Sequence, residues 1–362
     1  MITDMRDKGV HLSEQEGKLI FKAPKGIIDD TIKQYIIEHK SKIINCLIEG
    51  SDDRLIKVEY RPERIPLSYE QDRLWFLAEL GQASQYHVPG FINIAGKVNP
   101  FVIEKAFEFL AERHETLKSC YKQGEDGEPY MEIPESVQIP VSYLKFHGKD
   151  ILSDEVTAAT TKFVNEPFDI ENGPLIRVVV IELSEDKYVL GYCMHHIISD
   201  GWSINILQRE LNLIFKGFYE KKEPNFPPME IQFADFAIWQ RKVLSSQKLT
   251  EKIAHWKEHL SGHEDINVPL DFTRPEVLSG DGDFVVLELN QAKSGWLREY
   301  CRGKNVTLFS LLLSMVYTLL NRYTMQYDMC IGLPVANRNQ KEVENMIGFF
   351  ANTIINRVQF NK

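Results

Sequence analysis

The chain has 362 residues, of which 43% are hydrophobic and 26% charged, and its formal net charge at pH 7 is −10. This composition is typical of a soluble globular protein of about two domains and excludes wholesale disorder. The net negative charge argues against general binding to nucleic acid or to an anionic membrane, and no apolar run is long enough to predict a membrane span.

The cysteines and the N-terminus also restrict the class of protein. Five cysteines are scattered through the sequence without a CxxC pair, which argues against both a disulfide framework and a structural zinc site. Residues 1–17 lack an apolar core, so they do not resemble a secretory signal. We therefore expect a reduced, cytoplasmic protein with no metal site, no nucleic-acid partner and no membrane partner.

Residues 1–50 are predicted to form a small separate unit. Apolar and polar residues alternate over 10–13 and again over 18–22, with a turn between them, which is typical of a β-hairpin. Two short helices are expected after the hairpin, over 30–38 and 40–48. A polar linker follows this unit and continues to residue 65.

Beyond the linker, the sequence predicts a mixture of helices and strands, and the fold class is α+β. Apolar residues at helical spacing indicate helices at 68–80, 102–113, 203–219, 294–302 and 308–323. The last of these is apolar along its whole length and is predicted to be buried. Short apolar runs bounded by turn residues indicate strands at 175–183, 187–195, 284–289 and 328–333.

The most distinctive local pattern is Tyr-Cys-Met-His-His-Ile-Ile-Ser-Asp-Gly-Trp at 192–202. A hydrophobic strand ends in His195 and His196, and Asp200 and Gly201 follow just before a helix. Because side chains alternate along a strand, the two histidines are expected to point to opposite faces, which disfavours chelation of one metal by both. A histidine at a strand end is well placed to act as a general base, so we predict one working histidine and one packing histidine.

Seven segments carry motifs in a consistent order along the chain. Besides HHxxxDG at 195–201, they are LSYEQDRLWFL at 67–77, RHETLKS at 113–119, EPFD with GPLIR at 166–177, FADFAIW at 233–239, GLPVANR at 332–338 and IGFFANT at 347–353. Together they resemble the condensation domain family of nonribosomal peptide synthetases, whose signature is HHxxxDG. Tyr69 and Glu70 depart from the opening motif, which is usually written SxAQxRLWFL.

This resemblance implies a chloramphenicol-acetyltransferase-like fold of two lobes, a first lobe over 66–240 and a second lobe over 241–362. It implies an amide-forming acyltransferase, in which the amine of an acceptor aminoacyl thioester attacks a donor acyl or peptidyl thioester. Phosphopantetheine arms of upstream and downstream carrier domains would supply both substrates, so no cofactor is expected to bind this chain directly.

Members of the family usually continue well beyond the last motif, so the second lobe is expected to be incomplete here. We therefore expect an exposed apolar surface or a compensating partner on that lobe. Whether this chain is active by itself stays open.

The resemblance assigns the chemistry to His196, either as acceptor of the amine proton or as a hydrogen-bonding partner of the nucleophile and the tetrahedral intermediate. His195 is assigned a structural role. Two other interpretations share this fold. An epimerisation domain would follow a carrier domain instead of opening a subunit, and a non-catalytic recruitment platform tends to have a degraded signature, whereas His196 is intact.

Supporting roles are also implied by the resemblance. Asp200 is expected to pair with an arginine, because a bidentate guanidinium suits a buried carboxylate, and the candidates are Arg113 and Arg338. Gly201 and Asn352 are expected to line the substrate channel.

Residues 3–50 resemble the N-terminal docking domains of the tubulysin-synthetase type, on the segments GVHL at 9–12 and GKLIFKAPKG at 17–26. In that family, the C-terminal tail of an upstream subunit adds as a strand at the edge of the hairpin. We expect an acidic tail from an upstream synthetase subunit, because lysines alternate along this edge. The residues predicted to bind it are Lys18, Ile20, Lys22 and Lys25.

Overall fold

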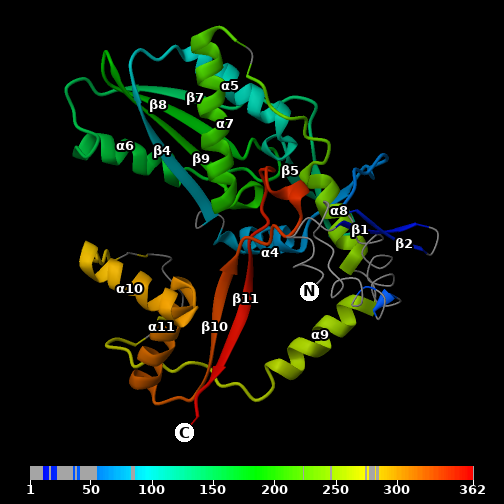
Figure 1. Ribbon diagram of the computed structural model, residues 1–362. Coiled ribbons are helices and arrows are strands. Elements are labelled where there is room, and N and C mark those ends of the chain that lie inside the picture. The colour runs from blue at the N-terminus through cyan, green and yellow to red at the C-terminus, as the bar shows by residue number, and fades with distance from the viewer. Residues whose placement is uncertain are drawn as a thin grey trace.

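The computed structural model describes residues 11–15, 18–22, 36, 39–40, 55–82, 86–222, 224–244, 247–273, 275–276, 282 and 285–361. Two sheets and their covering helices form the first lobe, and further helices with a two-stranded sheet form the second lobe (Figure 1). The predicted α+β class is confirmed.

A four-stranded sheet in the order β4-β9-β8-β7 forms the centre of the first lobe. Strand β9 (Lys187–His195) pairs antiparallel with β4 (His87–Ala95) and with β8 (Ile176–Ser184). Strand β8 also pairs parallel with β7 (Val141–Lys145). The two strands predicted on either side of the Ser-Glu-Asp turn are therefore confirmed to within one residue.

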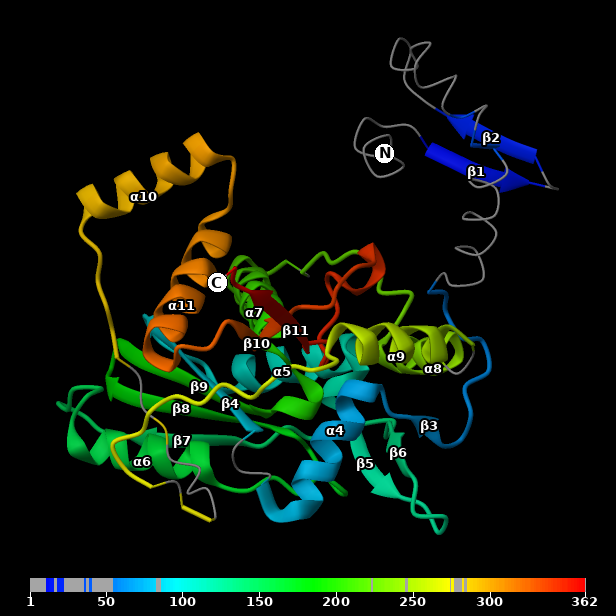
Figure 2. The same ribbon diagram turned by 90° about the horizontal axis from the view of Figure 1, so that it is seen from below.

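Helices cover both faces of this sheet (Figure 2). Helices α5 (Pro100–Arg113) and α7 (Gly201–Glu220) pack on one face, and α6 (Asp154–Asn165) packs on the other. In β8, Val178 belongs to the core beneath α5 and α7, whereas Val179 belongs to the core beneath α6. A strand buried on both faces is apolar along its length, which is why β8 can be recognised in the sequence.

A smaller sheet in the order β3-β6-β5 lies beside the first. Its strands are β3 (Ile65–Pro66), β5 (Cys120–Gln123) and β6 (Pro129–Glu132). Helix α4 (Tyr69–Leu77) follows β3 and begins with a capping box at Ser68, which satisfies two of the free N–H groups at the helix start.

The segment before β3 packs on the first lobe, at the end of the predicted linker. Leu55 is 1% exposed. The guanidinium of Arg61 bonds the buried carboxylate of Asp235 at 3.0 Å and that of Glu115 at 2.9 Å. The described part of the predicted linker is thus held in place, because its apolar and cationic side chains both find buried partners.

The remaining elements are α8 (Phe233–Leu244), α9 (Gln247–His259), α10 (Gln291–Lys304), α11 (Leu308–Thr324), β10 (Asp328–Val335) and β11 (Asn352–Gln359). Short turns of other helix types occupy Ala78–Gln82, Glu115–Leu117, His196–Ile198 and Lys341–Val343. Strands β10 and β11 pair antiparallel. The strand predicted at 284–289 is wrong, because the described residues 285–289 form no strand.

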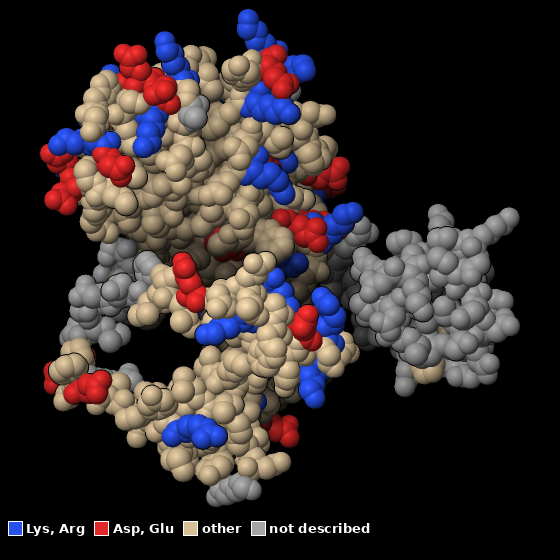
Figure 3. Space-filling view, turned by 60° about the vertical axis from the view of Figure 1, so that its left-hand side comes forward, with Lys and Arg blue, Asp and Glu red and all other residues tan. Residues whose placement is uncertain are grey.

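Helix α11 is apolar but exposed, so the prediction of a buried helix is wrong. Among its described residues only Tyr317 is buried, whereas Phe309, Leu319 and Tyr323 are 62%, 56% and 66% exposed. On the face shown in Figure 3, the second lobe carries few charged side chains. The expected exposed apolar surface is confirmed; an apolar helix is buried only where another element faces it.

The described residues contain no single helix that is long and apolar enough to cross a membrane. Helices α10 and α11 taken together meet the length and composition of a span, but they are bent by 100° at the break between them.

The connection between β10 and β11 returns to the first lobe (Figure 1). Its residues Val343, Met346, Ile347, Phe349 and Phe350 are at most 3% exposed and belong to the same core as α5, α7 and α8. This return places the motif at 347–353 against the motif at 195–201, although the two are far apart in the sequence.

The predicted hairpin of the N-terminal unit is confirmed as β1 (His11–Gln15) paired antiparallel with β2 (Lys18–Lys22). The first strand ends two residues later than predicted, at Gln15. The register places Lys18, Ile20 and Lys22 opposite Gln15, Ser13 and His11. Lys25 lies outside the described residues, and the two helices predicted at 30–38 and 40–48 lie largely outside them.

Candidate active site

The two histidines of the signature have different environments. Strand β9 ends at His195, which is fully buried, and its Nδ1 accepts a hydrogen bond from the backbone N–H of Ile197 at 3.2 Å. Its ring lies edge-to-face with the rings of His87 and Phe168. His196 begins a single 3₁₀ turn and is only partly buried. The predicted strand alternation therefore stops at His195, because the chain leaves the strand before His196.

His196 has a defined arrangement of ring nitrogens. Its Nδ1 lies 2.6 Å from the carbonyl oxygen of Ser199. Because a carbonyl oxygen can only accept, Nδ1 must carry the proton and donate. The neutral ring then has an unprotonated Nε2, the atom that could take a proton from a substrate. The imidazole ring of His196 also lies edge-to-face with the phenyl ring of Phe349, and the two ring centroids are 4.9 Å apart.

Asp200 pairs with Arg338, one of the two predicted arginines. The Nη2 atom of Arg338 lies 3.1 Å and 3.3 Å from the two carboxylate oxygens of Asp200. Both side chains are 2% exposed. Burial lowers the pKa of Arg338, and the charge of Asp200 opposes this change. The pair therefore links the start of α7 to the segment between β10 and β11.

The Asp200 carboxylate accepts further hydrogen bonds. Its Oδ1 caps α7 by accepting from the backbone N–H of Ser203 at 2.8 Å, and its Oδ2 accepts from the backbone N–H of Phe350 at 3.1 Å. Arg338 also donates to the carbonyl oxygens of Val343 and Met346. Because protein donors already engage both carboxylate oxygens, Asp200 has a structural role.

Arg113, the other predicted partner, contacts a different carboxylate. Its Nε lies 3.2 Å from both oxygens of Glu210, which also binds Nε2 of His114 at 2.8 Å. Burial lowers the pKa of His114. Although burial raises the pKa of Glu210, the hydrogen bond from His114 and the charge of Arg113 bring it below its usual range. Sequence reasoning missed Glu210, because only the fold brings α5 and α7 together.

Gly201 and Asn352 lie at different places. Gly201 begins α7, and a Cβ added to it would meet no atom within 4 Å, so it borders open space. The side-chain amide of Asn352 donates to Oε1 of Glu70 at 3.3 Å, and Asn337 donates to the same oxygen at 3.2 Å. Burial raises the pKa of Glu70. The side-chain amide N–H of Asn352 thus contacts α4, where Glu70 replaces the alanine of the opening motif.

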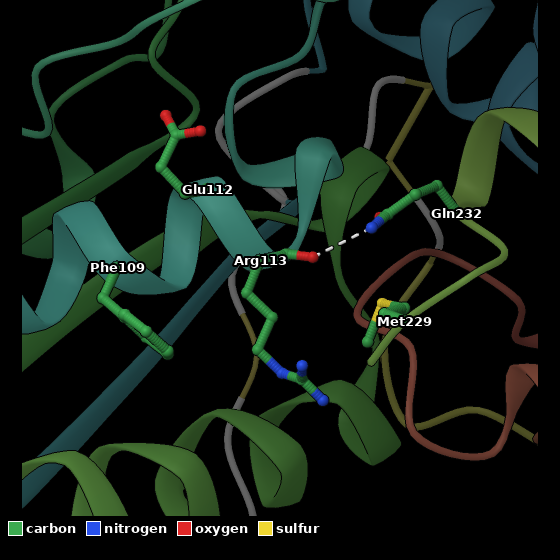
Figure 4. Close-up of a pocket in the computed structure, with 5 residues that line it drawn as sticks. All are labelled: Phe109, Glu112, Arg113, Met229 and Gln232. Carbon is green, nitrogen blue, oxygen red and sulfur yellow. Dashed lines mark hydrogen bonds between the residues drawn. The ribbon is translucent and has the colours of Figure 1, made fainter. Parts of the chain in front are cut away.

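An open pocket of about 340 Å³ lies on the first lobe beside Arg113 (Figure 4). Gln232 donates to the backbone oxygen of Arg113 at 3.0 Å at its edge. The guanidinium of Arg113 is held by Glu210 and by the carbonyl oxygen of Pro227. The guanidinium of Arg113 that borders the pocket is therefore already bonded to protein acceptors.

Two families match this chain. Residues 62–362 match the family described as Condensation domain, and residues 1–49 match the family described as TubC N-terminal docking domain. Malpinin synthetase of Mortierella alpina is 34% identical over 303 residues, which are 83% of this chain and 4% of that protein. Bacitracin synthase 2 of Bacillus licheniformis is 31% identical over 361 residues, which are 98% of this chain and 13% of that protein.

Among solved structures, the X-domain from teicoplanin biosynthesis is similar with a TM-score of 0.74 and 25% sequence identity, covering 84% of this chain and 67% of that chain. The chain belongs to the condensation domain family, with a TubC-type docking domain at its N-terminal end. Condensation domains form amide bonds in nonribosomal peptide synthetases, so the enzyme class predicted from the sequence is the class of this family. The chain spans only a small part of the two synthetases.

Proposed function

We propose that this chain joins a donor acyl or peptidyl thioester to the amine of an acceptor aminoacyl thioester. Carrier domains would present both substrates on phosphopantetheine arms. The observation that carries this proposal is the state of His196: its ring is partly exposed, and its Nδ1–H is engaged by Ser199, which leaves Nε2 as the acceptor.

In the proposed reaction, the lone pair of the acceptor amine attacks the thioester carbonyl carbon and forms the C–N bond. The carbonyl electrons move to oxygen, and Nε2 of His196 takes a proton from the nitrogen. The intermediate then collapses, the C–S bond breaks, and the departing thiolate takes the proton back from His196. Because a thioester is already activated, placing the two arms close together supplies much of the rate enhancement.

A weaker form of the same role keeps His196 as a hydrogen-bonding partner of the nucleophile and the tetrahedral intermediate. Asp200 has no proton-transfer role in either form. Its carboxylate already holds Arg338 and two backbone N–H groups, so its role is to fix the segment between β10 and β11.

The second candidate is a non-catalytic recruitment platform. The structural similarity to the teicoplanin X-domain favours it, since one such X-domain structure is a complex with OxyB. The arrangement of His196 favours the enzyme, because a platform has no need of a partly exposed, oriented imidazole.

The test is a peptide-bond assay with the full-length protein and two carrier proteins, one loaded with a donor and one with an acceptor, read by mass spectrometry of the carrier arms. We expect amide product, and we expect His196→Ala to abolish it while the fold stays intact. His147→Ala is the matched control, because His147 is 55% exposed and its ring contacts Glu182, away from the signature. His195→Ala is expected to reduce solubility first. Equal loss of turnover in both signature variants, with unchanged melting, would reverse the assignment.

For the N-terminal unit, we infer a docking role toward an upstream synthetase subunit. The family match at 1–49 and the hairpin register support this inference. The partner we expect is an acidic C-terminal tail, which would pair its backbone with the hairpin edge beside Lys18, Ile20, Lys22 and Lys25.

A further inference from the structure

Phe349, on the connection between β10 and β11, lies against the ring of His196. The two ring centroids are 4.9 Å apart with an interplanar angle of 69°, and Phe349 is 3% exposed. The imidazole also donates a hydrogen bond from Nδ1 to the carbonyl oxygen of Ser199. A single hydrogen bond leaves the ring free to rock about its outer torsion, because that torsion has broad wells. The phenyl ring supplies the second restraint.

Both neighbours of Phe349 are fastened to the start of α7. The backbone N–H of Gly348 donates to Oγ of Ser203 at 3.1 Å, and that of Phe350 donates to Oδ2 of Asp200 at 3.1 Å. A Cβ on Gly348 would lie 2.1 Å from the ring of Phe233, so the backbone here packs directly on that side chain. The position of Phe349 is therefore set by bonds on both sides of it.

Ile347, which precedes Gly348, is held by the first lobe as well. The hydroxyl of Thr116 donates to the carbonyl oxygen of Ile347 at 3.1 Å, and the backbone N–H of Ile347 lies 3.4 Å from Nδ1 of His114. This segment thus has little freedom, and any side chain it carries toward His196 is preorganised.

We propose that Phe349 is a positioning residue that holds the imidazole of His196 in its reactive orientation. This proposal rests on the proposed role of His196 as proton acceptor. Its consequence is that the connection between β10 and β11 sets the geometry of a base that follows β9.

The first test is nuclear magnetic resonance of the full-length protein with ¹⁵N-labelled histidine. We expect a single Nδ1–H tautomer for His196 and an Overhauser contact between its ring and that of Phe349. In Phe349→Leu, signals of both tautomers or exchange broadening are expected. Phe107→Leu is the matched control, because Phe107 is also a fully buried phenylalanine of this core but lies on α5, whereas the ring contact described for His196 is with Phe349.

The second test is kinetic. Loss of one aromatic restraint on the base should lower kcat by roughly tenfold in Phe349→Leu, while KM stays within about twofold. Phe107→Leu should keep kcat within about twofold at temperatures where it is folded. The two proposals fail separately: turnover in His196→Ala overturns the proposed function. An inactive His196→Ala together with matching tautomers and kcat in the two leucine variants overturns the positioning role. If Phe349→Leu does not fold, a wild-type spectrum with mixed tautomers or no contact between the rings overturns it.

Discussion

Replacing Asp200 by alanine should destabilise the protein strongly. The substitution leaves the buried Arg338 guanidinium with carbonyl oxygens and the Ser203 hydroxyl in place of its carboxylate partner. It also removes the cap of α7 and leaves the N–H of Phe350 without its acceptor. Removing one partner of a buried ion pair costs about 3–5 kcal/mol. The cap and the N–H are part of the same cluster, so their costs overlap with this figure instead of adding to it.

The assay is thermal unfolding of the full-length protein at pH 7. A loss of about 4 kcal/mol corresponds to a drop in Tm of roughly 8–16 °C for a large domain. The control is Asp126→Ala, which removes an aspartate that is 60% exposed and lies 3.4 Å from Arg64. An exposed pair of this kind contributes about 0–1 kcal/mol.

A double variant tests the mechanism itself. Arg338→Met removes the buried cation, so Asp200→Ala combined with Arg338→Met should be less destabilised than the sum of the two single variants. The reasoning is wrong if Asp200→Ala melts within about 2 °C of the wild type, as Asp126→Ala is expected to do.

Three further outcomes are expected. Burial lowers the pKa of His114 in the folded protein. At a pH between the folded and the unfolded pKa of this residue, the unfolded chain therefore binds one more proton, and stability falls as pH drops below about 6.5. This loss, measured as Tm against pH, should be smaller in His114→Gln. Gly348→Ala should lower Tm, because the added Cβ would lie 2.1 Å from the ring of Phe233. Gly201→Ala should leave Tm unchanged, because the space beside Gly201 is open. Equal Tm values for the two variants would contradict this prediction. Charge reversal at Lys18 and Lys22 should weaken binding of the upstream subunit's C-terminal tail peptide by about tenfold or more in calorimetry, without changing Tm. The affinity of the wild-type protein for the peptide should fall as salt is added. An affinity unchanged by the charge reversal would refute binding of an acidic tail.

Local pattern determined much of this protein. Ser68 and the residues after it specify the capped start of α4, and the apolar runs specify β8 and β9, because capping and continuous burial are encoded by neighbouring residues. The order of the motifs specified the family, and HHxxxDG singled out His196 among the histidines.

Tertiary structure decided what depends on a distant partner. The choice of Arg338 over Arg113 for Asp200 follows from the return of the β10–β11 connection to the first lobe, which no local pattern encodes. The same return brings Phe349 to His196. Strand alternation did not extend to His196, since the chain turns there into a 3₁₀ helix.

Burial was the property that sequence predicted least well. The apolar residues of α11 predicted a core helix, yet exposure depends on whether another element faces the helix, and the described residues leave most of that surface open. Glu70 shows the opposite case: a charged residue in a motif position usually held by alanine is buried, because Gln240, Asn337 and Asn352 arrive from other elements to bind its carboxylate.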